Sequence, residues 1–202
     1  PSSLPEAMLD VTDAPSGGIR FGSFNHNRKL SDETLKLWAK IFATLPSASL
    51  VLKASNKDDK GTQELLCRRM RRQGLDPERV IWLPRAPSAT EHLHQYQFVD
   101  VVLDCFPNGG CTTTCEALWM GTPVITLAGN SYVSRMSTAV LAGAGLSQWS
   151  VHTKQAYLDL AVSLVDCLRD LRQQRDQWRN KIKTNELGDA SGLMLNLENS
   201  LK

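Results

Sequence analysis

The chain has 202 residues, of which 42% are hydrophobic and 22% are charged, a composition typical of globular domains that excludes wholesale disorder. Its 23 lysines and arginines nearly balance its 21 aspartates and glutamates, for a formal net charge of +2, and this argues against a dedicated nucleic-acid-binding domain. No apolar run approaches the length of a membrane span, so we expect no membrane association.

The first residues contain neither an initiator methionine nor a signal peptide, so we expect a cytoplasmic chain that is part of a longer protein. Five cysteines are an odd number, and without a secretory signal we expect free thiols. Cys105, Cys111 and Cys115 lack the second pair of ligands that a zinc site needs downstream. The sequence therefore predicts no metal site.

In chain order, residues 1–18 are expected to form a linker, because prolines and a Gly17-Gly18 pair interrupt any periodicity. A strand over 19–24 and a polar loop over 25–29 follow. Ser31 is a good helix N-cap, and apolar residues then recur at helical spacing until Pro46. These patterns place the first strand and the first helix of the domain.

Strands and helices alternate through the rest of the chain. We expect strands over 49–53, 79–83, 100–104 and 123–127, and helices over 59–72, 88–98, 113–120, 134–142, 154–182 and 188–201. The strands are rich in Val, Ile and Leu without polar alternation, which is typical of a parallel sheet covered by helices on both faces. The sequence predicts a doubly wound, Rossmann-like α/β domain over 19–202, with ligand-binding loops at 24–31, 84–91 and 104–113.

The loop after the predicted strand at 100–104 carries the strongest chemical signal. The Gly109-Gly110 pair lets backbone approach a ligand closely. Three threonines from Thr112 then open a helix, whose free N–H groups can bind an anion. Glu116, one turn later, would repel a phosphate but could accept hydrogen bonds from a ribose diol. The pattern indicates a nucleotide site, although a capped helix without a ligand explains it equally well.

Other polar residues lie in the expected ligand-binding loops. Lys29 could neutralise a diphosphate leaving group, with His26 as a polar neighbour. His92 could stack on a base. Each of the three also fits an ordinary surface position. The loops contain neither a Walker A motif nor a GxGxxG fingerprint, so ATP hydrolysis and dinucleotide redox chemistry have no support.

Several separate motifs together resemble a known family. They are Phe21-Gly22-Ser23-Phe24-Asn25 with Lys29, Glu91-His92-Leu93, Asp100-Val101-Val102-Leu103-Asp104, Thr112-Thr113-x-x-Glu116-Ala117-Leu118-Trp119-x-Gly121-x-Pro123, and Ser134-Arg135. In order and spacing they are similar to the C-terminal catalytic half of the O-linked N-acetylglucosamine transferase (Spindly-type) family. The resemblance runs from about residue 19 to the helix predicted at 154–182. It implies a GT-B-type glycosyltransferase, of which this chain resembles the donor-binding half.

The resemblance also implies roles for individual residues. Seven positions match the donor-binding residues of the family, namely His26, Lys29, Ala86, His92, Thr112, Thr113 and Glu116. It assigns Lys29 as the catalytic residue that contacts the donor diphosphate, with Thr112 and Thr113 beside it. Ala86 and His92 would contact the base. Glu116 stands where many members have Asp on the ribose hydroxyls, and either carboxylate can accept two hydrogen bonds.

Family members carry tetratricopeptide repeats and an N-terminal catalytic half before this region, and neither occurs in the chain. We therefore expect an O-GlcNAc transferase-like fragment that binds donor but is inactive alone, with the protein acceptor held by those upstream regions. The implied donor is a UDP-sugar, with UDP-N-acetylglucosamine preferred and GDP-fucose left open, and no cofactor or metal. The alternative is a Rossmann-like nucleotide-binding or regulatory module without transfer. A sugar-nucleotide epimerase is a weaker alternative, because it would need a dinucleotide fingerprint after the first strand and the loop there does not contain one.

Overall fold

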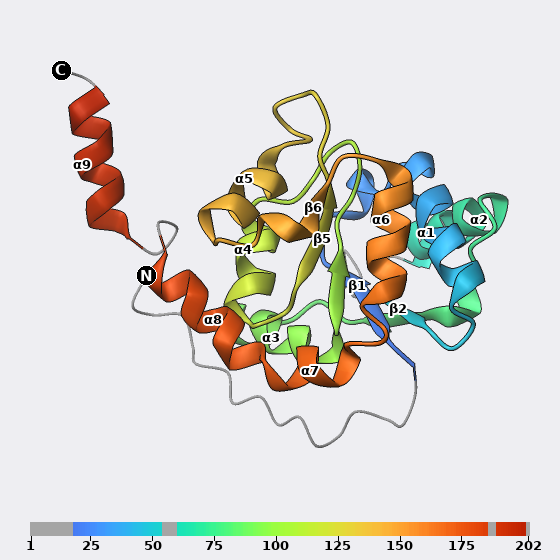
Figure 1. Ribbon diagram of the computed structural model, residues 1–202. Coiled ribbons are helices and arrows are strands. Elements are labelled where there is room, and N and C mark those ends of the chain that lie inside the picture. The colour runs from blue at the N-terminus through green and yellow to red at the C-terminus, as the bar shows by residue number, and fades with distance from the viewer. Residues whose placement is uncertain (1–17, 54–59, 186–188, 201–202) are drawn as a thin grey trace.

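A computed structural model describes residues 18–53, 60–185 and 189–200, so the linker predicted at 1–18 lies outside the described residues except for Gly18. The chain forms a six-stranded parallel sheet with the strand order β3-β2-β1-β4-β5-β6 (Figure 1). The strands are β1 (Arg20–Ser23), β2 (Ser49–Lys53), β3 (Val80–Leu83), β4 (Val101–Leu103), β5 (Val124–Leu127) and β6 (Ser150–Val151). The predicted doubly wound fold is confirmed, and only the two-residue β6 was not predicted.

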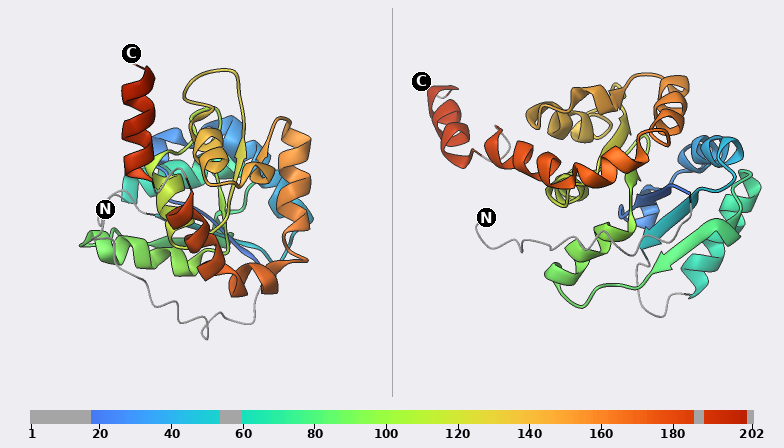
Figure 2. Two further views of the ribbon diagram at one scale, coloured as in Figure 1. Left: turned by 60° about the vertical axis from the view of Figure 1, so that its left-hand side comes forward. Right: turned by 60° about the horizontal axis from the view of Figure 1, so that its bottom comes forward.

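Helices cover both faces of the sheet. They are α1 (Asp32–Thr44), α2 (Lys60–Arg72), α3 (Ala89–His94), α4 (Thr112–Trp119), α5 (Met136–Gly143), α6 (Lys154–Ser163), α7 (Leu168–Gln173), α8 (Arg175–Thr184) and α9 (Ala190–Ser200), with 3-10 turns at η1 (Asn27–Lys29), η2 (Pro77–Arg79), η3 (Gln95–Phe98) and η4 (Ser147–Trp149). Helices α1, α2 and α6 pack on one face, and α3, α4, α5 and α8 on the other (Figures 1 and 2). The sheet is thus the middle layer of three.

Alternate residues of the strands fill two separate hydrophobic clusters. In β2, Leu50 and Leu52 pack with Trp38 of α1 on one face, whereas Val51 packs with Leu118 of α4 on the other. Each fully buried aliphatic side chain contributes about 1.5–3 kcal/mol of transfer free energy. Because both faces of β1, β2, β4 and β5 are buried, apolar residues occur there without polar alternation, as the sequence pattern predicted.

The predicted N-cap at Ser31 is confirmed, and two further helix ends have similar local features. The hydroxyl of Ser31 accepts a hydrogen bond from the Thr34 N–H (3.0 Å) at the start of α1, and that of Ser88 accepts one from the Glu91 N–H (3.2 Å) at the start of α3. Gly74, just after α2, has a backbone φ of 82°. Residues other than glycine rarely adopt this angle, so the glycine favours the end of the helix at this point.

The strand order reverses between β1 and β4, which are neighbours in the sheet. The chain leaves β1 toward α1 on one face and leaves β4 toward α4 on the other. In open α/β sheets, ligands bind beyond the carboxyl ends of the strands at such a reversal point. The loops over 24–31 and 104–111 both start there. The fold therefore predicts a ligand site at two of the loops that the sequence analysis expected to bind a ligand.

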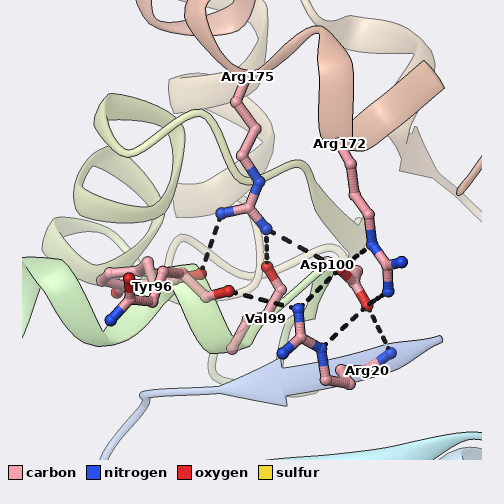
Figure 3. Close-up of polar contacts among 7 residues, drawn as sticks. Arg20, Tyr96, Val99, Asp100, Arg172 and Arg175 are labelled. Carbon is pink, nitrogen blue, oxygen red and sulfur yellow. Dashed lines mark hydrogen bonds and ion pairs between the residues drawn. The ribbon is translucent and has the colours of Figure 1, made fainter. Parts of the chain in front are cut away.

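The long helix predicted over 154–182 is wrong, because the structure divides this segment into α6, α7 and α8. Residues 164–167 and Gln174 interrupt it. The breaks let α7 and α8 pass beneath the amino-terminal ends of the strands, where Arg172 and Arg175 approach Asp100 (Figure 3). A tertiary contact therefore overrides a continuous helical pattern.

Asp100 is the centre of this junction and is buried. Its carboxylate accepts hydrogen bonds from the backbone N–H of Arg20 (2.8 Å) and from Nε and Nη2 of Arg172 (both 2.9 Å), and Arg175 lies 4.0 Å away. Burial alone would raise the pKa of Asp100, but the hydrogen bonds from Arg172 and Arg20 outweigh it and hold the pKa below its ordinary value. Burial lowers the pKa of Arg175 to about 10.

Helix α9, which matches the helix predicted over 188–201, extends away from the sheet (Figures 1 and 2). Within the described ranges, none of the helices is both long and apolar enough to cross a membrane. All five cysteines carry free thiols.

Candidate functional site

The loop after β4 is held in place by a buried carboxylate, that of Asp104. Its Oδ1 accepts hydrogen bonds from the backbone N–H of Gly110 (2.8 Å) and from Nδ2 of Asn25 (3.1 Å). Its Oδ2 accepts one from the Thr126 hydroxyl (2.8 Å) at β5. A single side chain thus connects the loops that follow β1 and β4 at the reversal point.

Gly110 sits where a side chain would not fit. A Cβ atom at this position would lie 2.6 Å from the hydroxyl oxygens of both Thr113 and Thr114. The Thr113 hydroxyl donates a hydrogen bond to Oδ1 of Asn25 (3.1 Å). The glycine therefore lets the loop backbone fold closely over the first turn of α4.

Lys29 joins the two loops from the other side. Its ammonium, at the end of η1, donates a hydrogen bond to the carbonyl oxygen of Gly109 (2.8 Å). Lys29 is half-buried, and Gly109 lies three residues before the start of α4. Cys111, the residue before α4, makes no side-chain hydrogen bond to the first turn of the helix. A cation and a helix N-terminus are the two features that bind phosphate groups in proteins.

Glu116, one turn into α4, is the centre of a polar network. Its Oε2 contacts Nε2 of His92 (3.0 Å) and accepts a hydrogen bond from the Tyr96 hydroxyl (3.4 Å). The other ring nitrogen of His92, Nδ1, contacts the Lys53 ammonium at the end of β2. The rings of Phe24 and Tyr96 pack together with centroids 4.4 Å apart and border His92. A partly exposed carboxylate therefore lies beside an aromatic surface.

Burial changes the ionisation of two members of this network. It lowers the pKa of the Lys53 ammonium below its ordinary value, although the Glu116 carboxylate opposes the shift and Arg85 adds to it. Burial raises the pKa of Tyr96 well above its usual range, and the charge of Glu116 and the hydrogen bond to it act in the same direction. Tyr96 is thus a neutral hydrogen-bond donor.

Five of the seven predicted residues come together at the carboxyl ends of β1 and β4. They are Lys29, His92, Thr112, Thr113 and Glu116. His26 is exposed, and its Nδ1 accepts a hydrogen bond from the Arg28 N–H (3.2 Å) at the start of η1. Ala86 lies half-buried in the connection between β3 and α3. The roles of these residues toward a donor stay predictions.

Four residues of the site were missed by the sequence reasoning: Asn25, Lys53, Tyr96 and Asp104. Lys53 and Asp104 occur directly at the carboxyl ends of buried strands, which is a signal that the sequence does carry. Asn25 lies in the loop over 24–31 that was expected to bind a ligand, but no local pattern indicates its contact with Asp104. Tyr96 reaches the site only through a contact between distant segments.

Two surface cavities in the described part of the chain lie away from this network. One of about 490 Å³ lies between α1 and α6 and is lined by Lys36 and Lys154. The other, of about 530 Å³, lies beside α2 over Trp82. Neither includes a predicted site residue, so the candidate site follows from its side-chain chemistry.

A profile of glycosyl transferase family 41 matches residues 7–194. The SPINDLY protein of Petunia hybrida, named a probable UDP-N-acetylglucosamine–peptide N-acetylglucosaminyltransferase, is 28% identical over 98% of this chain and 23% of that protein. The Caenorhabditis elegans UDP-N-acetylglucosamine–peptide N-acetylglucosaminyltransferase is 32% identical over 80% of this chain and 14% of that protein. The chain therefore spans less than a quarter of the length of these curated relatives.

A solved structure extends the similarity to three dimensions. A mutant of the Thermobaculum terrenum O-GlcNAc transferase superposes with a TM-score of 0.83 and 35% sequence identity, over 98% of this chain and 38% of that chain. The similar region thus includes both loops of the candidate site.

Proposed function

The chain belongs to glycosyl transferase family 41, the family that its motifs predicted, and we propose that it binds the nucleotide-sugar donor of a protein O-glycosyltransferase. The observation that carries the proposal is the pairing of Lys29 with the start of α4 at one end of the site and Glu116 at the other. A purely structural module needs neither a cation nor a diol acceptor on neighbouring loops.

In this proposal each end of the site binds one part of the donor. Lys29 and the backbone of Thr112 and Thr113 bind the diphosphate, and Glu116 accepts hydrogen bonds from the ribose hydroxyls. His92 contacts the base. The preferred donor is UDP-N-acetylglucosamine, the sugar nucleotide in the names of the relatives from Petunia and Caenorhabditis.

The chemistry that this site can supply concerns the leaving group. When the bond between the sugar and the diphosphate breaks, negative charge develops on the departing phosphate oxygen. In the proposal, the Lys29 ammonium and the N–H groups at the start of α4 stabilise that charge; the contact of Lys29 with the Gly109 carbonyl, in the loop before α4, supports this role. Because these groups already supply positive charge, the proposal includes donor binding without a metal ion.

Holding the acceptor is a separate task. Placing a protein hydroxyl in line with the anomeric carbon can contribute some 7–11 kcal/mol to the lowering of the barrier. We infer that the Ser/Thr acceptor is positioned by regions of the transferase beyond the aligned 14–38% of its relatives.

The five free thiols fit a cytoplasmic location.

Isothermal titration calorimetry tests the proposal. UDP, UDP-N-acetylglucosamine, GDP, GDP-fucose and ADP would be titrated into the chain, with and without EDTA. We expect the uridine nucleotides to bind most tightly, with the same affinity in EDTA. Binding of none of them at millimolar concentration would refute the proposal. A tenfold loss of affinity in EDTA would refute its metal-free part, and a preference for GDP-fucose would reassign the donor.

Replacing Glu116 with alanine is expected to weaken the binding of UDP-N-acetylglucosamine by about 1–3 kcal/mol, because hydrogen bonds to a charged acceptor are lost. The matched control is Glu64→Ala, which removes an exposed carboxylate from α2 and should leave the affinity unchanged. Equal affinities for the two variants in calorimetry would show that the ribose does not contact Glu116.

A further inference from the structure

Lys53 has no role in the donor contacts described above, yet it is half-buried at the carboxyl end of β2, against the ring of His92. We propose that Lys53 is a positioning residue, whose ammonium holds His92 as the neutral tautomer that donates from Nε2 to Glu116. The importance of this arrangement for the donor rests on the proposed function, whereas the arrangement itself is a property of the free protein.

The tautomer follows from which groups can donate. A lysine ammonium has three N–H donors and no acceptor, so the Nδ1 atom that it contacts must be the acceptor. The single proton of the neutral ring is then on Nε2, which faces Oε2 of Glu116 at 3.0 Å. Hydrogen bonds therefore run in one direction, from Lys53 through His92 to Glu116.

The contacts of the ring define which of its nitrogens can donate. Lys53 faces it from β2, Glu116 from α4 and the neutral Tyr96 from η3. Phe24 packs against it without a charge, and Arg85 lies near enough to act on the Lys53 ammonium. A second proton would turn Nδ1 into a donor that points at the ammonium. Protonation of His92 would thus require Lys53 to move away.

The same network leaves half of Glu116 free for a ligand. Oε2 receives His92 and Tyr96, whereas Oε1 has no hydrogen-bond partner among the described residues. The side chain is 25% exposed. By fixing His92, Lys53 keeps Oε2 of Glu116 in its hydrogen bond to the imidazole ring. Oε1 then stays available to donors outside the network, which in the proposed function are the ribose hydroxyls.

Imidazole ¹⁵N NMR tests the inference on the free protein, with the His92 signals assigned from a His92→Gln variant. In the wild-type chain we expect the Nε2–H tautomer of the neutral ring. In Lys53→Met nothing holds Nδ1 as an acceptor, so the Nδ1–H tautomer should become populated. Lys53→Arg should restore the wild-type spectrum, because a guanidinium is also a donor only. Lys36→Met, on the exposed face of α1, is the matched control and should leave the spectrum unchanged.

A second measurement connects the tautomer to the ligand. Isothermal titration calorimetry measures the affinity for UDP-N-acetylglucosamine in the wild-type chain and in Lys53→Met. For Lys53→Met we expect an affinity about tenfold lower. A wild-type His92 that carries its proton on Nδ1, or one whose tautomer is the same in Lys53→Met, would overturn the inference. The expected spectra without any binding of UDP-N-acetylglucosamine would instead refute the proposed donor and leave the role of Lys53 intact.

Discussion

Replacing Asp100 with alanine is expected to lower the free energy of unfolding by about 3–5 kcal/mol, because it leaves buried arginines without their counter-ion. Arg175 is almost fully buried and would keep only the backbone carbonyls of Tyr96 and Val99 as hydrogen-bond partners. Arg172 would lose both of its hydrogen bonds to the carboxylate. Urea denaturation followed by tryptophan fluorescence measures the change. Donor affinity of the folded variant should stay at the wild-type value, since Asp100 precedes β4 and the site follows it.

The pH dependence of stability gives a second view of the same residue. The pKa of Asp100 is below its ordinary value in the folded state, so its contribution is complete above the unfolded pKa of about 3.9. It is lost as the pH falls through the folded pKa. Stability of the wild-type chain should therefore decrease more steeply below about pH 4 than that of Asp100→Ala. The control is Asp166→Ala, in the exposed turn between α6 and α7, for which we expect a change within about 0.5 kcal/mol. An equal loss in the free energy of unfolding in Asp100→Ala and Asp166→Ala would contradict the prediction.

Replacing Asp104 with alanine is expected to affect both stability and binding. The change leaves three buried donors without an acceptor, namely the Gly110 N–H, Asn25 Nδ2 and the Thr126 hydroxyl. Each costs about 1–3 kcal/mol, so we expect a loss of at least about 3 kcal/mol in the free energy of unfolding. The loops that carry Lys29 and Thr113 also lose their common anchor. Donor affinity of the folded fraction should therefore fall at least about tenfold.

Asp104→Asn is the matched variant. It keeps an oxygen for the Gly110 N–H and Asn25, and its new amide can donate to the Thr126 hydroxyl, which also accepts hydrogen bonds. We expect it to lose about 1 kcal/mol of stability and to keep most of its donor affinity. Calorimetry on both variants at a temperature where each is folded separates the two effects. Full donor affinity in Asp104→Ala would show that the anchored loops do not bind the donor.

The two carboxylates occupy the two ends of one three-residue strand. Asp100 joins the strand to α7 and α8 at the amino end, and Asp104 joins two loops at the carboxyl end. The contrast between their variants therefore separates damage to the fold from damage to the site.

Much of the fold could be predicted because its signals are local. The limits of β2 follow from a run of apolar residues between polar ones, and the starts of α1 and α3 follow from the hydroxyls of Ser31 and Ser88. The threonines and Glu116 indicated α4 and its chemistry for the same reason. Such features depend on residues within one turn of each other.

The features that sequence reasoning missed are contacts between distant segments. No glycine or proline marks the breaks between α6, α7 and α8, and the position of Arg172 relative to Asp100, 72 residues earlier, decides the path of the chain. The sequence indicates only that Lys53 is the polar residue at the end of a strand. Its contact with His92 becomes apparent only when β2 is positioned in the sheet next to β1. Its partner is 39 residues away, beyond the range of any periodicity.

The strand order has a consequence for how the protein folds as it is synthesised. β1 lies between β2 and β4, and its contact with the β4 segment joins residues 80 positions apart, as in the pair Arg20–Asp100. At a translation rate of about 5–20 residues per second, roughly 4–16 s pass before that partner leaves the ribosome. Until then a nascent sheet of β1, β2 and β3 exposes one edge of β1, and an open strand edge is a template for pairing with another chain. A strand that is interior in the final sheet is thus open to pairing with another chain during synthesis.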